Sequence, residues 1–201
     1  NNNGGADGIA FVLQDVGSNI PLTSSGGDFY NNINPSFCVE FDTYQNGNLG
    51  DPNSDHIAIQ KNGNNDHNST NSLVSPISLG NIEDGAWHNV IFSWDPSTFY
   101  FQVFFDGVLK VSYNNSIVNN IFNNNPDIYF GFIAGTGGSF NLQSVSINSI
   151  CQLSSTSIPG CTDPNATNYD PSATTDDGSC CYDNLVAITT DIDYFGNSYP
   201  W

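Results

Sequence analysis

Short apolar runs separated by clusters of Asn, Asp, Gly and Ser are the feature that most limits how this chain can fold. Helical periodicity is hard to find, and such spacing is typical of an all-β sandwich. Asp106-Gly107 predicts a two-residue hairpin, because both central residues of that turn need positive φ. The Asn-rich stretches 62–71 and 114–125 are predicted to be surface loops. The predicted strands are 8–13, 37–43, 56–59, 88–94, 100–105, 108–113, 128–134 and 143–147.

The composition of the chain changes after Cys151, where a stretch rich in Ser, Thr and Pro begins. The segment from Cys161 to Cys180 is polar and cannot build an apolar core. We expect a disulfide between these two cysteines to organise it, adding about 3 kcal/mol in the chain-entropy model. The predicted domains are a sandwich at 1–151, a linker at 152–160, a Cys-bounded polar repeat at 161–181 and the start of a further β-like module at 182–201. The chain is therefore expected to be a segment of a longer, processed protein.

The cysteines indicate an oxidising compartment. There are five of them, and four lie in the last third of the chain, which favours disulfides and a secreted or cell-surface protein. Cys151 and Cys181 are candidates to pair at the module junction. Cys38 would then be free as a small buried hydrophobe, although a role as a thiolate ligand stays open.

The charge balance narrows the classes of partner. The chain has a formal net charge of −18 at pH 7, with only 2 basic residues against 20 acidic ones. Nucleic acid and anionic membrane surfaces are disfavoured, because phosphate binding needs clustered Lys and Arg. No stretch is apolar for long enough to cross a membrane. Divalent cations and neutral sugars remain as candidate ligands.

One predicted strand carries two carboxylates on the same face. Glu40 and Asp42 are two residues apart, so their side chains point the same way. Paired carboxylates on a buried strand repel each other, and a divalent cation removes that cost. Asn46 and Asp51 follow on a Gly-containing loop, and His56 opens the next strand. Oxygen ligands suit calcium, and carboxylates with an imidazole suit manganese or another transition metal.

The other two histidines are interpreted differently. His67 and His88 lack a convincing set of carboxylate or Cys partners at ligand spacing. They are predicted to be ordinary surface or sheet residues.

Several segments, taken in order, closely resemble legume lectins and their bacterial L-type relatives. They are Ala6-Asp7-Gly8-Ile9-Ala10-Phe11, Ser25-Gly26-Gly27, Glu40-Phe41-Asp42-Thr43-Tyr44-x-Asn46, Asp51-Pro52, His56-Ile57-Ala58-Ile59, Gly131 to Gly138, and Asn141-Leu142-Gln143-Ser144-Val145. The resemblance covers Gly5 to about Ile150. It implies a concanavalin-like (jelly-roll) antiparallel β-sandwich and calcium-dependent carbohydrate binding without catalysis.

The resemblance also implies a role for individual residues. The transition metal would be held by Glu40, Asp42, Asp51 and His56. Calcium would be held by Asp42, the Tyr44 carbonyl, the Asn46 side chain and Asp51. Sugar contacts would come from Asp7, Gly27, the Tyr44 ring, Asn46, Gly138 and Ser139. A cis peptide between Ala6 and Asp7 is also common in the family.

The chain departs from the family at its N-terminus. The family has strands ahead of the Ala-Asp-Gly segment, and only six residues precede Asp7 here. We therefore expect the sheet edge beside Gly8–Leu13 to be covered by upstream residues or another chain.

The C-terminal repeat has two open interpretations. The stretch from Cys161 to Cys180 resembles a short Cys-bounded repeat of secreted Bacteroidetes proteins. Its Asp and Asn side chains could bind another calcium ion. A disulfide-closed spacer with Asx turns explains the same residues at least as well.

Three functions compete. A sugar-binding module of a secreted or surface adhesin is favoured. A structural subunit of a surface filament or large adhesin is the main alternative. A glycoside hydrolase is disfavoured, because hydrolases of similar fold carry Glu-x-Asp-x-x-Glu and this chain has Gln45 at the last position.

Overall fold

The structure is a computed structural model. It describes residues 4–20, 30–31, 33–151, 160–171, 173, 176, 178–182 and 187–188. The chain forms two compact units, the first reaching to Gln143 and the second beginning at Ser144. In the described part of the chain, no helix has the length and apolar character needed to cross a membrane.

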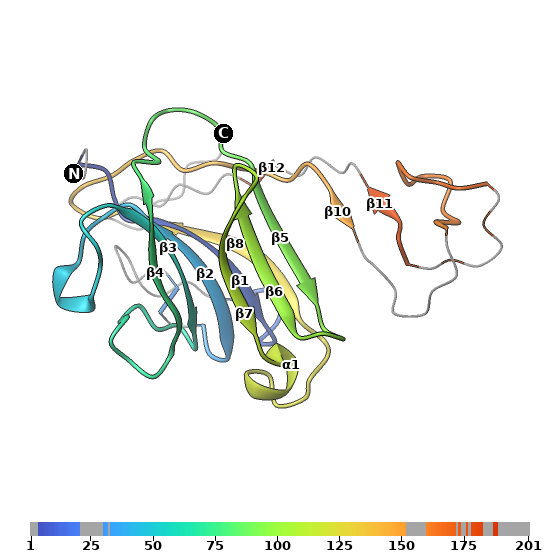
Figure 1. Cartoon of the computed structure of the whole chain (residues 1–201), viewed down its shortest axis with the longest axis horizontal. Coiled ribbons are helices and arrows are strands. Elements are labelled where there is room, and N and C mark those ends of the chain that lie inside the picture. The colour runs from blue at the N-terminus through green and yellow to red at the C-terminus, as the bar shows by residue number, and fades with distance from the viewer. Residues whose placement is uncertain are drawn as a thin grey trace. The chain divides into compact units, whose positions relative to one another are not determined.

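The first unit consists of two antiparallel sheets, as predicted (Figure 1). The larger sheet has the strand order β4-β3-β2-β1-β8 and contains the candidate site. Its strands are β1 (Gly8–Gln14), β2 (Ser36–Asp42), β3 (Asp55–Lys61), β4 (Ser72–Gly80) and β8 (Tyr129–Gly135). The smaller sheet contains β5 (Val90–Asp95), β6 (Tyr100–Phe105) and β7 (Val108–Asn114). The described part of this unit also contains two short helices, η2 (Gly47–Leu49) and α1 (Ile117–Asn120).

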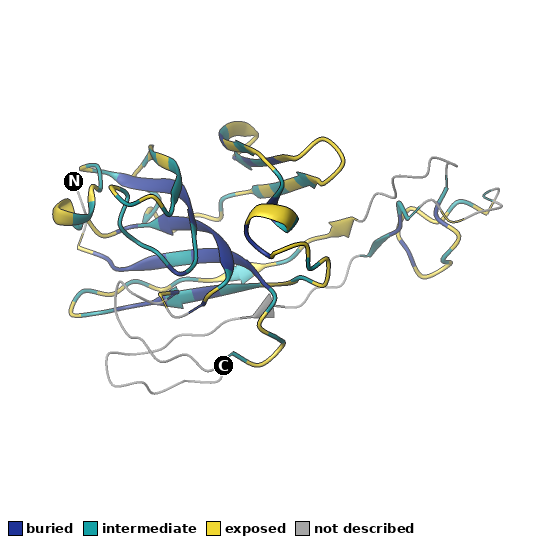
Figure 2. Cartoon of the chain, turned by 90° about the horizontal axis from the view of Figure 1, so that it is seen from below, coloured by how far each residue is buried: buried dark blue, intermediate teal, exposed yellow. Residues whose placement is uncertain are grey.

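Aromatic side chains fill the space between the two sheets. Phe11 of β1 stacks on Phe92 of β5 with ring centroids 4.2 Å apart, and Phe37 of β2 meets Phe101 of β6 edge to face. Alternate residues of β2 point to this core, and the residues between them point to the other face of the sheet. Both faces of β2 are buried, and Figure 2 shows buried residues concentrated in the strands. The carboxylates of β2 therefore lie in a part of the protein with little solvent.

The prediction that upstream residues or another chain cover the edge beside β1 is wrong. Strand β1 pairs with β2 on one side and with β8 on the other. Gly8–Leu13 thus lies inside the sheet, and residues far along the same chain cover it. No local pattern predicts this pairing, because it joins segments more than a hundred residues apart.

Other sequence expectations need smaller corrections. Strand β4 was missed because Pro76 interrupts its pattern, and it lies at the sheet edge where proline is tolerated. Helix α1 and the residues after it interrupt the predicted 114–125 loop, and Ile117 and Phe122 are buried. The Asp106-Gly107 hairpin is confirmed, with φ of 48° and 77°.

In its described residues, the second unit contains two small strand pairs and two disulfides. Strand β9 (Val145–Ser146) pairs with β12 (Ala187–Ile188), and β10 (Ile150–Cys151) pairs with β11 (Cys181–Tyr182). One disulfide joins Cys161 to Cys180, and the other joins Cys151 to Cys181. Cys38, in the first unit, is a free and buried thiol.

Candidate metal centre

Two neighbouring strands bring the predicted metal ligands to one face of the larger sheet. Asp42, at the end of β2, lies directly opposite His56, near the start of β3. Glu40 is two residues earlier on β2 and shares the face of Asp42. Glu40 and His56 are almost fully buried, at 2% and 1% exposure. The register of β2 on β3 therefore determines where these three side chains lie.

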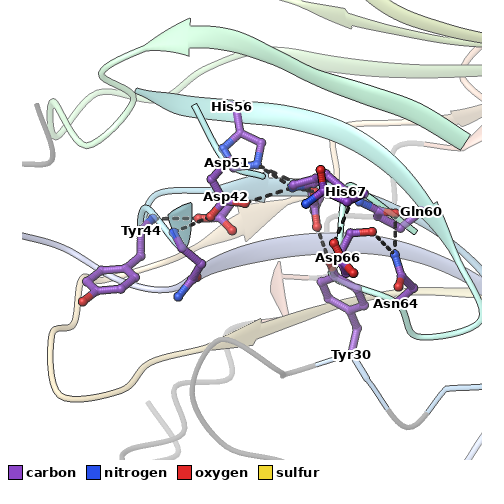
Figure 3. Close-up of polar contacts among 12 residues, drawn as sticks. Tyr30, Asp42, Tyr44, Asp51, His56, Gln60, Asn64, Asp66 and His67 are labelled. Atoms are coloured by element: carbon purple, nitrogen blue, oxygen red, sulfur yellow. Dashed lines mark hydrogen bonds and ion pairs between the residues drawn. The ribbon is translucent and has the colours of Figure 1, made fainter. Parts of the chain in front are cut away.

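The loop between the two strands contains the other three predicted ligands, of which Figure 3 labels Tyr44 and Asp51. The Tyr44 amide donates to Asp42 Oδ1 over 2.7 Å, and the Asn46 amide donates to Asp51 Oδ2. Asn46 occupies the N-cap position of η2, but its side chain makes no capping hydrogen bond. These contacts fold the loop so that Asp51 returns to the face that carries Asp42.

The two carboxylate oxygens of Glu40 have different surroundings. Oε2 accepts a hydrogen bond from the buried Tyr30 hydroxyl, a partner that the sequence did not suggest. Oε1 is buried and accepts no hydrogen bond from the described residues. The Nε2 atoms of His67 and His56 lie 3.2 Å and 3.7 Å from it. A buried carboxylate oxygen without a donor is what a cation-binding site presents.

The interpretation of His67 as an ordinary surface residue is wrong. The 62–71 loop folds back over the sheet, and the His67 amide donates to the Leu49 carbonyl over 2.9 Å. Its Nε2 lies 3.2 Å from Asp51 Oδ1 and 3.2 Å from His56 Nε2. Burial opposes charging of the ring, but the Asp51 hydrogen bond and the Glu40 charge raise the pKa of His67 above its usual value.

Electrostatics also favour a cation at this face. Burial and the neighbouring charges of Glu40, Asp51 and Asp7 raise the pKa of Asp42 to about 9. Carboxylates crowded in this way ionise together only if a positive charge joins them. Potential ligand atoms converge in two groups. One group contains Glu40, His56 and His67, and the other contains Asp42, Asp51 and His56. The donors fit one ion bound by oxygen and one bound partly by imidazole.

The predicted sugar-contacting residues lie beside this centre. The Ala6–Asp7 peptide is cis, in agreement with the family resemblance. The Asp7 amide donates to the Gly135 carbonyl over 2.8 Å, and the Thr43 amide donates to the Asp7 carbonyl over 3.0 Å. Asp7 is thereby held between the ends of β8 and β2. Tyr44 is 39% exposed, so its ring is accessible to a ligand.

The loop after β8 returns to the same place. The Asn141 amide donates to the Ala6 carbonyl over 3.2 Å, which brings the Gly138-Ser139 turn back toward Asp7. The Asn141 side chain also donates to Thr43 and to Glu83, a residue that sequence reasoning missed. Gly27, the remaining predicted sugar contact, lies outside the described residues.

His88 is a partly exposed residue outside the metal centre, but two carboxylates that the sequence did not suggest contact it. Its Nδ1 lies 2.7 Å from Asp106 Oδ2, and its Nε2 lies 3.4 Å from Asp84 Oδ1. The hydrogen bond to Asp106 and the two aspartate charges outweigh desolvation and raise the pKa of His88. These groups are partly exposed and far along the chain from the metal centre, so we interpret them as a structural contact.

Replacing His88 with Gln is expected to reduce stability only in acid. Since the folded-state pKa of His88 is raised, its charged contact contributes fully below the unfolded pKa and is lost as pH rises through the folded pKa. Thermal unfolding of the parent and His88→Gln should therefore differ at pH 5 to 6 and converge in mildly alkaline buffer. A difference that grows with pH would contradict the assignment.

The comparisons with known proteins agree with this fold and site. Residues 1–149 match a family model described as the legume lectin β-barrel domain. A mannose/glucose-specific lectin of Centrolobium tomentosum is 31% identical over 160 residues, covering 72% of this chain and 62% of that protein. The mannose-specific lectin CML-2 of Centrolobium microchaete is also 31% identical, with 72% and 61% covered. The chain thus spans about three fifths of the curated relatives that it matches.

Solved structures that resemble this chain are also lectins. The winged bean acidic lectin complexed with methyl-α-D-galactose has a TM-score of 0.50 at 27% identity, covering 68% of this chain and 56% of that one. A Bauhinia forficata lectin in complex with GalNAc has a TM-score of 0.53 at 21% identity, covering 67% and 60%, and shows the fold alone. Because the family model matches most of the sequence, this chain belongs to the legume lectin family.

Proposed function

We propose that the first unit is a calcium-dependent, non-catalytic carbohydrate-binding domain. The observation that carries the proposal is the convergence of Asp42, Asp51 and His56 beside Asp7 and the exposed Tyr44. Sugar hydroxyls need fixed donors and acceptors, and the apolar face of a sugar packs on an aromatic ring. A relative that is named for mannose and glucose, and one that is solved with methyl-α-D-galactose, support this class of ligand.

In this proposal each ion has its own ligand set. Calcium is held by Asp42, the Tyr44 carbonyl, the Asn46 side chain and Asp51. Manganese or another transition metal is held by Glu40, Asp42, Asp51 and His56. Calcium would supply a rigid positive centre that fixes the loop from Tyr44 to Asp51. Direct sugar contacts are assigned to Asp7, Gly27, Tyr44, Asn46, Gly138 and Ser139.

We further propose that the domain occupies residues 1–151 of a secreted or surface adhesin of bacterial origin. In this proposal the domain is followed by a linker at 152–160, a Cys-bounded repeat at 161–181 and the start of a further module at 182–201. Two disulfides in the second unit support an oxidising compartment.

A glycan array tests the carbohydrate proposal. Binding should disappear after treatment with a chelator, return on addition of calcium, and stay absent with magnesium alone, since the ligand set suits the larger cation. Chelator-resistant binding would contradict calcium dependence. A metal-loaded protein that binds no glycan would instead support the alternative of a structural adhesin or filament subunit.

Hydrolysis of polysaccharides is expected to be absent. Retaining hydrolysis needs two carboxyl groups about 5 Å apart, one of them a proton donor. Gln45 cannot donate a proton as an acid does, and its exposed side chain donates to Asn53 over 2.7 Å. Release of reducing ends from β-glucan and galactan panels should equal that of a heat-denatured sample. Activity that Glu40→Gln abolishes would overturn this expectation.

A further inference from the structure

His67 is the residue at this centre that neither the sequence pattern nor the family resemblance assigned. Its side chain is 3% exposed, and its Nε2 lies 3.2 Å from Glu40 Oε1, from Asp51 Oδ1 and from His56 Nε2. Figure 3 shows the ring reaching the carboxylates from the 62–71 loop. Thus the two imidazole nitrogens and Glu40 Oε1 converge on one buried point, and Asp51 Oδ1 lies beside His67 Nε2.

Hydrogen bonds alone do not satisfy this arrangement. Two facing imidazole nitrogens share at most one proton between them, and Glu40 Oε1 accepts no hydrogen bond from the described residues. The other Glu40 oxygen is held by Tyr30, so Oε1 is fixed in its direction. A cation at the common point would be a partner for all of these atoms at once.

The spacing also fits a shared ion. Two nitrogens bound tetrahedrally to zinc, each about 2.05 Å from it, lie about 3.3 Å apart. The separation between His56 Nε2 and His67 Nε2 is 3.2 Å. Both rings therefore need little movement to bind one metal ion.

We propose that His67 is a direct ligand of the transition metal, which makes this a two-histidine centre selective for zinc-like ions over manganese. This inference rests on the metal centre of the proposed function and deepens it. Imidazole suits zinc, copper and nickel, whereas carboxylate and water suit manganese. A second imidazole in place of a water therefore strengthens zinc binding more than manganese binding.

Gln60 is the residue that would orient the new ligand. It lies against Nδ1 of His67, and Asn64 donates to Gln60 Oε1 over 2.8 Å. A ring bound through Nε2 carries its proton on Nδ1, so Gln60 must turn its amide oxygen toward the ring. A half-turn of the Gln60 amide supplies that acceptor without moving the backbone, and Asn64 then gives up its hydrogen bond to Gln60 but keeps the one to the Asp66 carbonyl.

The test measures metal affinity in the whole chain. Chelator-treated protein is saturated with calcium and then titrated separately with Zn²⁺ and Mn²⁺ against a chromophoric competitor. For His67→Ser, zinc affinity should fall about a hundredfold and manganese affinity less than tenfold, so their ratio drops at least tenfold. His88→Ser is the matched control, because it removes a histidine outside the centre, and its ratio should equal that of the parent.

A second measurement needs no variant, in case His67→Ser folds poorly. In the Co²⁺-loaded parent, two imidazole N–H protons should give hyperfine-shifted NMR signals, one from each ligand ring. A single signal, or an unchanged zinc-to-manganese ratio in folded His67→Ser, would overturn the inference. Glycan binding of the same samples separates the two proposals. Calcium-dependent binding with an unchanged ratio refutes only the role of His67, and absent binding with a reduced ratio refutes only the lectin function.

Discussion

Replacing Asp42 with Ala is expected to abolish metal binding and glycan binding together, with glycan affinity at least a hundredfold lower. Asp42 stands opposite His56 and beside Asp51, so its carboxylate belongs to both proposed ion sites. The Asp42 carboxylate also accepts a hydrogen bond from the Tyr44 amide, at the start of the loop that leads to Asp51. Its removal therefore takes away a ligand of each ion and a contact that shapes the loop.

Asp7→Ala should separate the two properties. Its backbone is held by Gly135 and Thr43, and those hydrogen bonds do not need the side chain. We expect this variant to lose glycan binding as fully as Asp42→Ala while it keeps calcium and the transition metal. Metal content by mass spectrometry, compared with binding to an immobilised glycan, distinguishes the two variants.

Asp95→Ala is a suitable control for both. Asp95 is exposed at the end of β5, where it accepts hydrogen bonds from Ser97 and Thr98. The control should retain metal and glycan at parental levels. If Asp42→Ala binds glycan as tightly as the parent, the proposal that bound metal shapes the sugar site is incorrect.

The part of the site that follows from local rules was predictable from sequence. Side chains alternate along a strand, so Glu40 and Asp42 had to share a face once the segment was assigned as β. Asp51 and His56 were close enough in the chain to return to that face through a short loop. The structure places all four there. The two sheets and the Asp106-Gly107 hairpin followed from equally local patterns.

The residues that were missed reach the site through tertiary contacts. His67 arrives because its loop is bound to Leu49, and Tyr30 because it packs beside Cys38 in a second apolar cluster. Glu83 reaches Asn141 across 58 positions of sequence. No periodicity encodes such approaches, since each depends on where distant segments of the chain pack. The pairing of β1 with β8 has the same origin.

Without metal, the protein is expected to become less stable as the pH rises. The pKa of Asp42 is raised from 3.8 to about 9 in the fold, with burial as the largest cause and the Glu40 charge next. Between these values the folded state holds a proton that the unfolded chain has released. Stability therefore falls with pH through this window, by at most about 1.4 kcal/mol per pH unit for one proton.

Metal removes this dependence. Calcium and the transition metal bind the deprotonated carboxylates, so the loaded fold holds no proton that the unfolded chain has released. The loaded protein should therefore keep its stability as pH rises, and its advantage over the chelated protein should grow. Urea unfolding of chelator-treated and metal-loaded protein from pH 5 to pH 9 tests both trends. The chelated Asp42→Asn variant should show a flatter profile than the chelated parent, because the amide has no proton to lose. A chelated parent whose stability rises with pH would mean that the Asp42 carboxylate is already ionised without a cation, and the electrostatic argument for the metal centre would fail.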